Sequence, residues 1–282
     1  MYLATQLNQT HTVEQLTKHG ADVGSPTKRY LRPIHVAAEN GFITMILLDH
    51  GADLNVQDSN QSTPLHLATQ KNQTEMVVKH GANMEIWNEE FLRPLHISAK
   101  KNYHEITQIL LQNGANVNAK CERYSAFEYA AVFYSFPTIV EMLIANGAEI
   151  SNYHFTPLHA ATISGKYKVF NILMANGANA NVKTYLSMTP LHGAVKSYQV
   201  GNQQEEIIET LISRGAEIDS KTDDGLTALH LCIEGDKVGF AKILLQNGAS
   251  MKIKTRIGKS PLEFAMELNH NIFMKLLIHS DY

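Results

Sequence analysis

The chain has 282 residues, of which 44% are hydrophobic and 18% charged, and its formal net charge is -3. This apolar fraction is that of a folded globular protein, and the small net charge excludes the overall basic bias expected of a nucleic-acid-binding protein. Two cysteines, Cys121 and Cys232, are too few for a disulfide scaffold and favour a reducing compartment. Because neither a signal peptide nor an apolar run of about 18 residues is visible, we expect a cytoplasmic protein without membrane insertion.

Two short motifs recur along the chain in a fixed order. The dipeptide Gly-Ala recurs every 30 to 38 residues, at Gly20, Gly51, Gly81, Gly114, Gly147, Gly177, Gly215 and Gly248. In phase with it runs a box of the type Thr-Pro-Leu-His. The six clear boxes begin at Arg32, Thr63, Arg93, Thr156, Thr189 and Thr227, and two weaker copies begin at Ser125 and Ser260. Eight boxes in register predict a repeat protein.

Each repeat is expected to consist of a hairpin, a helix, a short turn and a second helix. The Thr or Ser that opens the box caps the first helix, and the Pro after it lies in the first turn, where an N–H is not needed. Small residues such as Ala37 and Ala38 follow and allow close packing. The second helix is apolar and ends at the Gly of the Gly-Ala pair, where a positive φ is required. One such unit cannot bury its apolar face alone, so the pattern predicts a single all-α solenoid domain over residues 1–282.

The first residues and three repeats depart from this pattern. Residues 1–24 hold only the end of a repeat and are expected to form an N-terminal partial or cap repeat. The complete repeats are expected at 25–55, 56–85, 86–118, 119–151, 152–181, 182–219, 220–252 and 253–282. The first two have short second helices, so we expect weaker packing near residues 73–80. Repeat six carries about five extra residues around positions 198–204, which we expect to form a tolerated surface loop.

The pattern resembles the ankyrin repeat family over essentially the whole chain. The resemblance rests on the period near 33, the Thr-Pro-Leu-His box and the Leu-Leu-x-x-Gly-Ala ending, which is clearest at residues 244–249. It implies an ankyrin-repeat solenoid of stacked helix-turn-helix units joined by β-hairpin loops, and a role in protein–protein interaction. It also implies local hydrogen bonding between box and neighbouring repeat for His35, His66, His96, His159, His192 and His230.

No motif of the sequence indicates catalysis, a metal or a cofactor. Neither Cys-x-x-Cys nor His-Glu-x-x-His occurs, so a zinc site is unsupported. Residues 258–260 resemble the end of a phosphate-binding loop, but Ile253 stands where that loop requires its first Gly. Cys121 is interpreted as an incidental thiol on a hairpin. We therefore expect no enzyme activity, no cofactor and no metal, with an unrecognised catalytic site as a minor alternative.

The resemblance implies a binding surface at the hairpin tips and at the exposed positions of each first helix. This concave strip holds 15 Lys or Arg against 9 Asp or Glu, whereas the rest of the chain holds 9 against 18. The protein is thus expected to be electrically two-faced and to attract an acidic partner. The alternative is that this charge difference is ordinary variation of a solvated surface. A minor alternative is that the strip binds nucleic acid.

Aromatic residues concentrate on the same strip in repeats three to six. Tryptophan, tyrosine and arginine are frequent at the energetic centres of protein interfaces. We therefore predict a partner-binding surface made of Trp87, Phe91, Lys100, Lys101, Arg123, Tyr124, Phe133, Tyr153, Phe155, Ile163 and Tyr185. The alternative is that rings at the turns fold back over neighbouring hairpins. The partner is expected to be a protein with an acidic or mixed acidic-aromatic surface, and the solenoid itself a monomer.

Two further observations bear on modification and origin. A Leu precedes Asn55, Asn118 and Asn181 by eight residues, a spacing similar to that in ankyrin substrates of a eukaryotic asparaginyl hydroxylase; a turn-stabilising Asn is the alternative.

The chain has 18 Lys against 6 Arg, and 21 Asn, which suits an AT-rich genome. Ankyrin chains of that character are frequent in intracellular bacteria, so a host-directed effector in the host cytoplasm is one candidate. The other is a substrate-recruiting adaptor fragment of a larger protein with an enzymatic or channel domain outside this chain.

Overall fold

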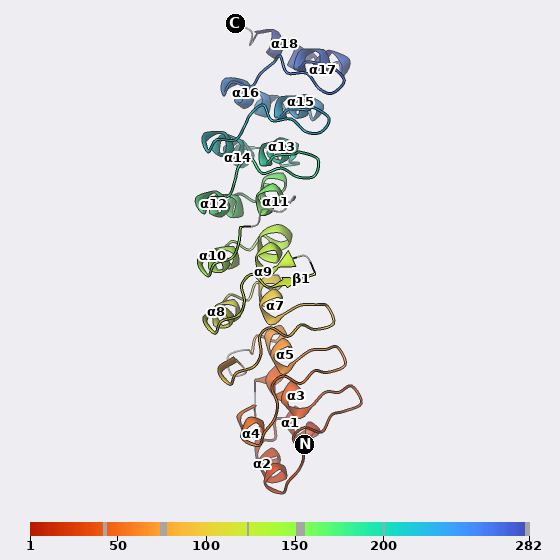
Figure 1. Ribbon diagram of the computed structural model, residues 1–282, viewed down its shortest axis with the longest axis vertical. Helices are drawn as coiled ribbons and strands as arrows, with labels where there is room; N and C mark the ends of the chain where they lie inside the picture. Colours follow the sequence, from red (N-terminus) through yellow and green to blue (C-terminus); the bar gives the residue numbers. More distant parts are fainter. Residues whose placement is uncertain (42–43, 74–77, 123, 151–155, 200, 280–282) are drawn as a thin grey trace. The chain divides into compact units, whose positions relative to one another are not determined.

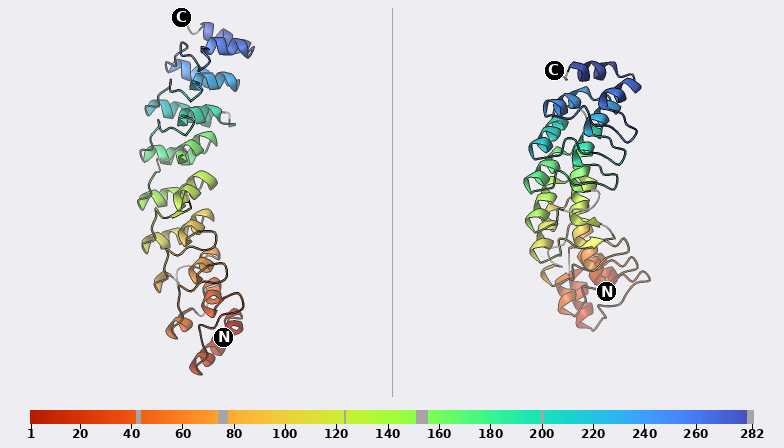
Figure 2. Two further views of the ribbon diagram at one scale, coloured as in Figure 1. Left: turned by 45° about the vertical axis from the view of Figure 1, so that its right-hand side comes forward. Right: turned by 45° about the horizontal axis from the view of Figure 1, so that its top comes forward.

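The computed structural model describes residues 1–41, 44–73, 78–122, 124–150, 156–199 and 201–279. Residue contacts group the chain into two compact units, Met1–Glu149 and Ile150–Tyr282. Within each unit, the box helices stack on one another, the second helices form a parallel row, and the loops before the boxes project from one side (Figures 1 and 2). The all-α repeat solenoid expected from the sequence is confirmed, whereas the single domain over 1–282 stays a prediction.

The first unit contains the partial repeat and repeats one to four. Its helices are α1 (Tyr2–Gln6), α2 (Thr10–Lys18), α3 (Pro33–Asn40), α4 (Thr44–Asp49), α5 (Pro64–Gln70), α7 (Pro94–Lys100), α8 (His104–Gln112), α9 (Ala126–Glu128), η1 (Tyr129–Tyr134) and α10 (Pro137–Ala145). Two short antiparallel strands, β1 (Lys120–Cys121) and β2 (Tyr124–Ser125), form the hairpin of repeat four, with Lys120 opposite Ser125. Box helix packs on box helix from α3 to α5, α7 and α9.

The second unit contains repeats five to eight. Its helices are α11 (Pro157–Ile163), α12 (Tyr167–Ala175), α13 (Pro190–Lys196), α14 (Asn202–Ser213), α15 (Ala228–Glu234), α16 (Val238–Gln246), α17 (Pro261–Glu267) and α18 (Asn271–His279). The stacking order is again that of the sequence, from α11 through α13 and α15 to α17. In repeats one and three to eight, one leucine of the second helix is buried at the same place in its repeat: Leu47, Leu110, Leu143, Leu173, Leu211, Leu244 and Leu277.

The box histidines tie each box helix to the next hairpin, as expected. The ring Nδ1 accepts a hydrogen bond from the backbone N–H of the residue that opens the box, at 3.1 Å between Thr63 and His66. Since Nδ1 accepts, Nε2 carries the ring proton and donates it to a carbonyl of the following hairpin. These donations run from His35 to Ser62 (3.2 Å), His66 to Leu92 (3.0 Å), His96 to Ala119 (3.0 Å), His159 to Met188 (3.0 Å) and His230 to Lys259 (3.3 Å). Within the described residues, Nε2 of His192 makes no such bond.

Backbone hydrogen bonds also join the tips of neighbouring hairpins. In the first unit, the amide of Ser59 donates to the carbonyl of Arg29 at 3.0 Å. In the second unit, the amide of Arg256 donates to the carbonyl of Asp224 at 2.8 Å. The approach is close there because Gly225, at φ 75°, has no Cβ: an added one would lie 2.6 Å from the Arg256 nitrogen. The tips are therefore ordered relative to their neighbours and not free loops.

Repeats four and six absorb their extra residues in different ways. In repeat four, the second helix starts nine positions after the last box residue, Glu128, instead of the eight found in repeats three, five, seven and eight. The additional residue is taken up by the π-helical turn η1. In repeat six, residues 202–204 form the first turn of α14, so the expected surface loop is shorter than predicted. The weak packing expected near residues 73–80 lies largely outside the described residues, since 74–77 are not described.

Candidate binding surface

Trp87 and Arg93 form the first part of the predicted surface, on the hairpin of repeat three. The guanidinium of Arg93 lies over the Trp87 ring, with its central carbon 5.5 Å from the ring centroid. The same side chain pairs with Glu85, at 3.2 Å from Nε to the carboxylate, and donates from Nη1 to the carbonyl of Lys120 at 2.7 Å. Arg93 thereby fixes the indole from one side and joins the hairpin of repeat three to strand β1 of repeat four.

Tyr124 and Phe133 form the second part, on repeat four. Their rings meet edge to face at 4.9 Å between centroids, and the partly buried Tyr129 packs on Phe133 at 5.6 Å. Tyr124 lies on β2 opposite Cys121, next to the residue that Arg93 contacts. Phe133 lies in η1, so the extra residue of repeat four helps to set the position of this ring. Edge-to-face contacts of this kind hold rings at a surface without burying them.

Phe91 completes the group at the tip of the hairpin of repeat three. It has φ 59°, a left-handed conformation that favours glycine, and the buried Asn88 supports the turn by accepting the amide of Leu92 at 3.0 Å. We call the four rings together the aromatic surface: Trp87, Phe91, Tyr124 and Phe133. Their exposed fractions lie between 40% and 51%. The rings thus neither join the core nor fold back completely over the neighbouring hairpins.

The charges beside the aromatic surface are partly neutralised. Lys100, at the end of α7, lies 3.6 Å from the carboxylate of Glu90. Lys101 donates to the carbonyl of Gln70 at 3.4 Å and lies 5.9 Å from the centroid of the Tyr103 ring. Exposed ion pairs contribute little to stability, so the Lys100 ammonium is available to a stronger partner. The basic character of this region is nevertheless weaker than the residue count suggested.

The remaining predicted residues belong to the second unit or lie outside the described residues. Tyr185 is 79% exposed on the hairpin of repeat six. Ile163 is half-buried and not exposed, because a Cβ on Gly193 of the next repeat would lie only 2.9 Å from its Cγ1. Its predicted place at an exposed helix position was therefore wrong, and the packing of α11 on α13 is the reason. Arg123, Tyr153 and Phe155 lie outside the described residues.

Two contributors to the surface were missed from the sequence. Arg93 was counted as the first residue of a box and among the basic residues of the strip but not as a site residue, although Arg in place of Thr at that position was a usable signal. Arg32 shows the same behaviour, since its Nε donates to the carbonyl eight residues earlier, as Arg93 does. Tyr129 was missed because its role depends on η1, and the only signal for it was the one-residue excess before α10.

The three asparagines of the hydroxylation hypothesis hold the turn of the following repeat. The side-chain oxygens of Asn55, Asn118 and Asn181 accept from the amides of Asn83, Glu149 and Glu217, at 2.8 to 2.9 Å. Asn118 and Asn181 also donate to a Gly carbonyl of the next repeat, at 3.0 and 2.8 Å. These contacts support the turn-stabilising interpretation, and hydroxylation stays a prediction.

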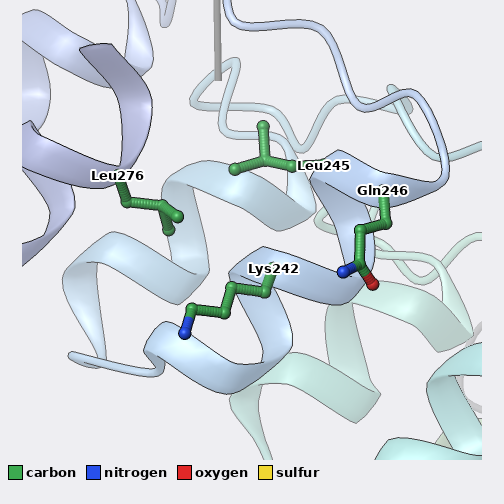
Figure 3. Close-up of a pocket in the computed structure, with 4 residues that line it drawn as sticks. All are labelled: Lys242, Leu245, Gln246 and Leu276. Atoms are coloured by element: carbon green, nitrogen blue, oxygen red, sulfur yellow. The ribbon is translucent and has the colours of Figure 1, made fainter. Parts of the chain in front are cut away.

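Other chemical features of the described chain are few. Cys121 is buried, with its sulfur 3.4 Å from the hydroxyl of Tyr129, and burial strongly raises the pKa of the Cys232 thiol. A pocket of about 340 Å³ lies between α16 and α18, lined by Lys242, Leu245, Gln246 and Leu276 (Figure 3). Among the described residues, no three His, Cys, Asp or Glu side chains come together as a metal site would need. None of the helices there is long and apolar enough to cross a membrane.

Comparison with known proteins agrees with this architecture. A family model for ankyrin repeats in three copies matches residues 1–86, 74–154, 95–184, 139–222 and 191–282. Over 284 aligned positions the chain is 28% identical to human transient receptor potential cation channel subfamily A member 1, covering 93% of this chain and 25% of the channel. It is 26% identical over 224 positions to the Caenorhabditis elegans homolog of that protein, covering 76% of this chain and 15% of the homolog.

A further relative aligns with a smaller share of this chain. Neurogenic locus notch homolog protein 1 of Danio rerio is 28% identical over 157 positions, which cover 54% of this chain and 6% of that protein. The chain thus spans a quarter or less of the length of these relatives. The boxes in register, the histidine bridges between repeats and a family model that matches along the whole length lead to one conclusion: the chain belongs to the ankyrin-repeat family.

Proposed function

We propose that this chain is a non-catalytic protein-interaction module whose binding site centres on the aromatic surface. The observation that carries the proposal is the exposure of four large rings on repeats three and four, three of which are held by the Arg93–Trp87 and Tyr124–Phe133 contacts. Ordered rings lose little conformational entropy on binding, and a partner that covers them removes apolar area from water. Ankyrin repeats are a general protein–protein interaction module, which agrees with this role.

The charges around the rings support a partner with both acidic and apolar groups. Arg93 lies over the Trp87 ring, and Lys100, Lys101 and Lys120 belong to the same two repeats as the aromatic surface. Carboxylates of the chain pair with Arg93 and Lys100. A partner carboxylate near Lys100 competes with Glu90 alone, which is itself exposed. We propose an acidic segment that places an aromatic or aliphatic side chain against the rings. We propose further contacts at Arg123, Tyr153, Phe155 and Tyr185 of repeats four to six.

The experiment compares wild type with two substitutions of the aromatic surface and one matched control. Trp87→Ala and Phe133→Ala each remove one ring, whereas Tyr198→Ala removes a ring that is 95% exposed elsewhere. Partners captured from extract are identified by mass spectrometry, and their affinities are then measured by calorimetry. We expect each ring substitution to weaken binding by about 10-fold or more and Tyr198→Ala to leave it unchanged. Urea unfolding of each variant checks that the fold is intact.

Binding that survives both ring substitutions would remove the aromatic surface from the proposal. Equal losses for all three variants would indicate a general effect on the protein and no particular site. Extracts from the producing cell and from a eukaryotic host should be compared, because selective capture from the host extract is what the host-directed effector hypothesis expects. Exclusive capture of proteins from the producing cell would contradict that hypothesis.

The second candidate function is the adaptor fragment, and the comparisons favour it in one respect. The chain aligns over most of its length with a region that makes up 25% of a cation channel subunit and 15% of its worm homolog. A repeat array that presents a partner to another domain of the same protein fits that arrangement. Sequencing the native transcript tests the idea: a reading frame that continues into a catalytic or channel domain supports the adaptor role, and one without such a domain contradicts it.

A further inference from the structure

Repeats six to eight carry a lysine at the same place in their hairpins. Lys183, Lys221 and Lys254 each lie six positions before the residue that opens the box of their repeat, and we call them the lysine row. All three are exposed, and the hairpins that carry them project from the same side of the second unit (Figure 1). Lys183 and Lys221 are exposed although another repeat follows theirs, so the stacking of repeats does not cover this place.

Each lysine of the row acts on the same neighbour within its repeat. The pKa values of His192 and His230 are lowered mainly by burial, and the positive charge of the lysine in the same repeat lowers them further. In repeat eight, Glu263 stands where those histidines are. Its pKa is lowered first by hydrogen bonds from Ser260 and then by the charge of Lys254. The three ammonium groups therefore occupy equivalent places in three successive repeats.

The side chain at this place extends along the stack toward the next repeat. Nζ of Lys221 donates to the backbone carbonyl of Lys254 at 3.3 Å. Gln57 occupies the same place in repeat two of the first unit, and its side chain donates to the carbonyl of Trp87, the corresponding residue of repeat three, at 3.2 Å. Neighbouring members of the row are thus one repeat apart, and packed helices lie about 10 Å apart.

The lysine row has no carboxylate partners of its own. In the part of the chain that the structure describes, none of its three ammonium groups forms an ion pair. Two nearby carboxylates are engaged by hydroxyl groups: Asp223 accepts from Ser187 at 2.6 Å, and Glu263 from Ser260 at 2.8 Å. Unpaired charges of one sign, spaced at about one Debye length, create a local positive potential that attracts an acidic partner.

The spacing of the row fits an acidic peptide in an extended conformation. An extended chain advances about 3.3 Å per residue, so every third residue advances by about 10 Å, which matches one repeat. The hairpin tips beside the row offer apolar contacts, since Leu186 is 64% and Ile257 70% exposed. Asp223 and Asp224 at the tip between them would repel the continuous phosphate backbone of a nucleic acid. A protein segment can place a neutral residue there.

We propose that the lysine row binds an extended acidic segment of a protein partner, with one carboxylate at each lysine and two residues between successive carboxylates. This surface lies in the second unit and does not depend on the aromatic surface of the first. Backbone hydrogen bonds close the hairpins, at 3.0 Å from the amide of Thr222 to the carbonyl of Leu226, so binding orders little additional backbone. A single exposed ion pair is weak, and binding therefore requires all three contacts together.

Fluorescence anisotropy with two labelled heptapeptides tests the proposal on the full chain. One peptide has the sequence Glu-Ser-Thr-Glu-Ser-Thr-Glu, and the other has the same composition with its three glutamates adjacent. We expect the spaced peptide to bind about 3-fold or more tightly than the other, because only its carboxylates can reach all three lysines. Its affinity should fall as the salt concentration is raised.

Two triple variants with the same change in net charge show whether the row is the binding site. The first variant replaces the lysine row with glutamine and should weaken binding of the spaced peptide by about 10-fold or more. The matched control replaces three exposed lysines on the second helices α12, α16 and α18 and should bind like wild type: Lys168→Gln, Lys242→Gln and Lys275→Gln. Lys221→Arg keeps the charge and should keep the affinity. Urea unfolding checks the fold of every variant.

Four outcomes would overturn the proposal. Equal affinities of the two peptides would show that the spacing is not read, and equal losses in the two triple variants would indicate an effect of net charge alone. Failure of the wild type to bind the spaced peptide at low salt would remove the site. A single-stranded oligonucleotide that binds more tightly than the spaced peptide, and is lost in the row variant, would assign the row to nucleic acid.

Discussion

Lowering the pH from 7.5 to 5 is expected to destabilise this protein through its box histidines. All six are at most 1% exposed, and burial lowers the pKa of each. For His66, His96 and His192 the pKa falls from the ordinary 6.5 to about 4. The geometry adds a second reason, because the ring atom that would receive the proton, Nδ1, already accepts a backbone N–H.

The sign and size of the effect follow from these pKa values. In the unfolded chain the imidazoles take up protons near pH 6.5, but in the folded chain only near pH 4. The folded state therefore keeps its full stability above pH 6.5 and loses it progressively between pH 6.5 and 4. At pH 5 each of the three rings lowers the free energy of unfolding by about 2 kcal/mol, which is roughly 6 kcal/mol for the three together. That is comparable with the whole unfolding free energy of a domain, about 5–15 kcal/mol.

Urea unfolding followed by far-ultraviolet circular dichroism measures this dependence at several pH values between 7.5 and 5. The midpoint should fall steadily, with about three protons taken up on unfolding near pH 5.5. His66→Gln cannot be charged, so it should lower stability at pH 7.5 but reduce the loss at pH 5 by about 2 kcal/mol. The exposed Asn176→Ala, which removes no titratable group, is the control and should leave the pH dependence unchanged. Equal stability at pH 7.5 and 5, or an unchanged slope for His66→Gln, would refute the reasoning.

Three substitutions test contacts between neighbouring repeats, each read from urea midpoints. Gly225→Ala should lower the free energy of unfolding by about 2–4 kcal/mol, because the new Cβ would lie 2.6 Å from the next hairpin. Gly258 also has a positive φ but no atom within 4 Å of the added Cβ, so Gly258→Ala should lower it by only about 1 kcal/mol. Equal losses for the two variants would contradict the steric explanation. Asn181→Ala removes two bonds to the next repeat and should cost about 1–2 kcal/mol, more than Asn176→Ala, which removes one bond within its own helix. Gln204→Leu should cost about 1–3 kcal/mol, since its side chain donates to carbonyls of two box helices; an unchanged midpoint would mean that water replaces it there.

The repeating parts of the fold were predictable because their causes are local. The helix starts at Thr156 and Thr189 follow from a capping side chain and a proline within four residues, and both are visible in the sequence. The role of His66 was also predictable, since the same imidazole recurs at one place in each of six boxes. Positions that repeat at a fixed period have similar surroundings, so one interpretation serves five of the six histidines, and His192 is the exception.

The candidate site was less predictable because it depends on departures from the period. Ile163 was assigned to the exposed strip from its place in the repeat, yet it is half-buried because Gly193 of the next repeat lacks a side chain. Lys100 was counted as a basic group, but its pairing with Glu90 depends on how the end of α7 meets a hairpin tip. Each outcome is set by a contact between elements that lie far apart in the repeat, and composition carries no information on such contacts.

The aromatic surface shows how one departure produces a local feature that the repeat does not have. A single extra residue in repeat four is accommodated as η1, and the ring of Phe133 in that turn meets Tyr124 on the preceding hairpin. In repeat three, Arg in place of Thr at the start of the box brings Arg93 onto Trp87 and the neighbouring strand. Both changes act on the side of the stack where the hairpins lie and leave the buried leucines in register. A stack of similar units can thus acquire a particular binding surface by local exceptions, while the buried leucines of the shared core stay in register.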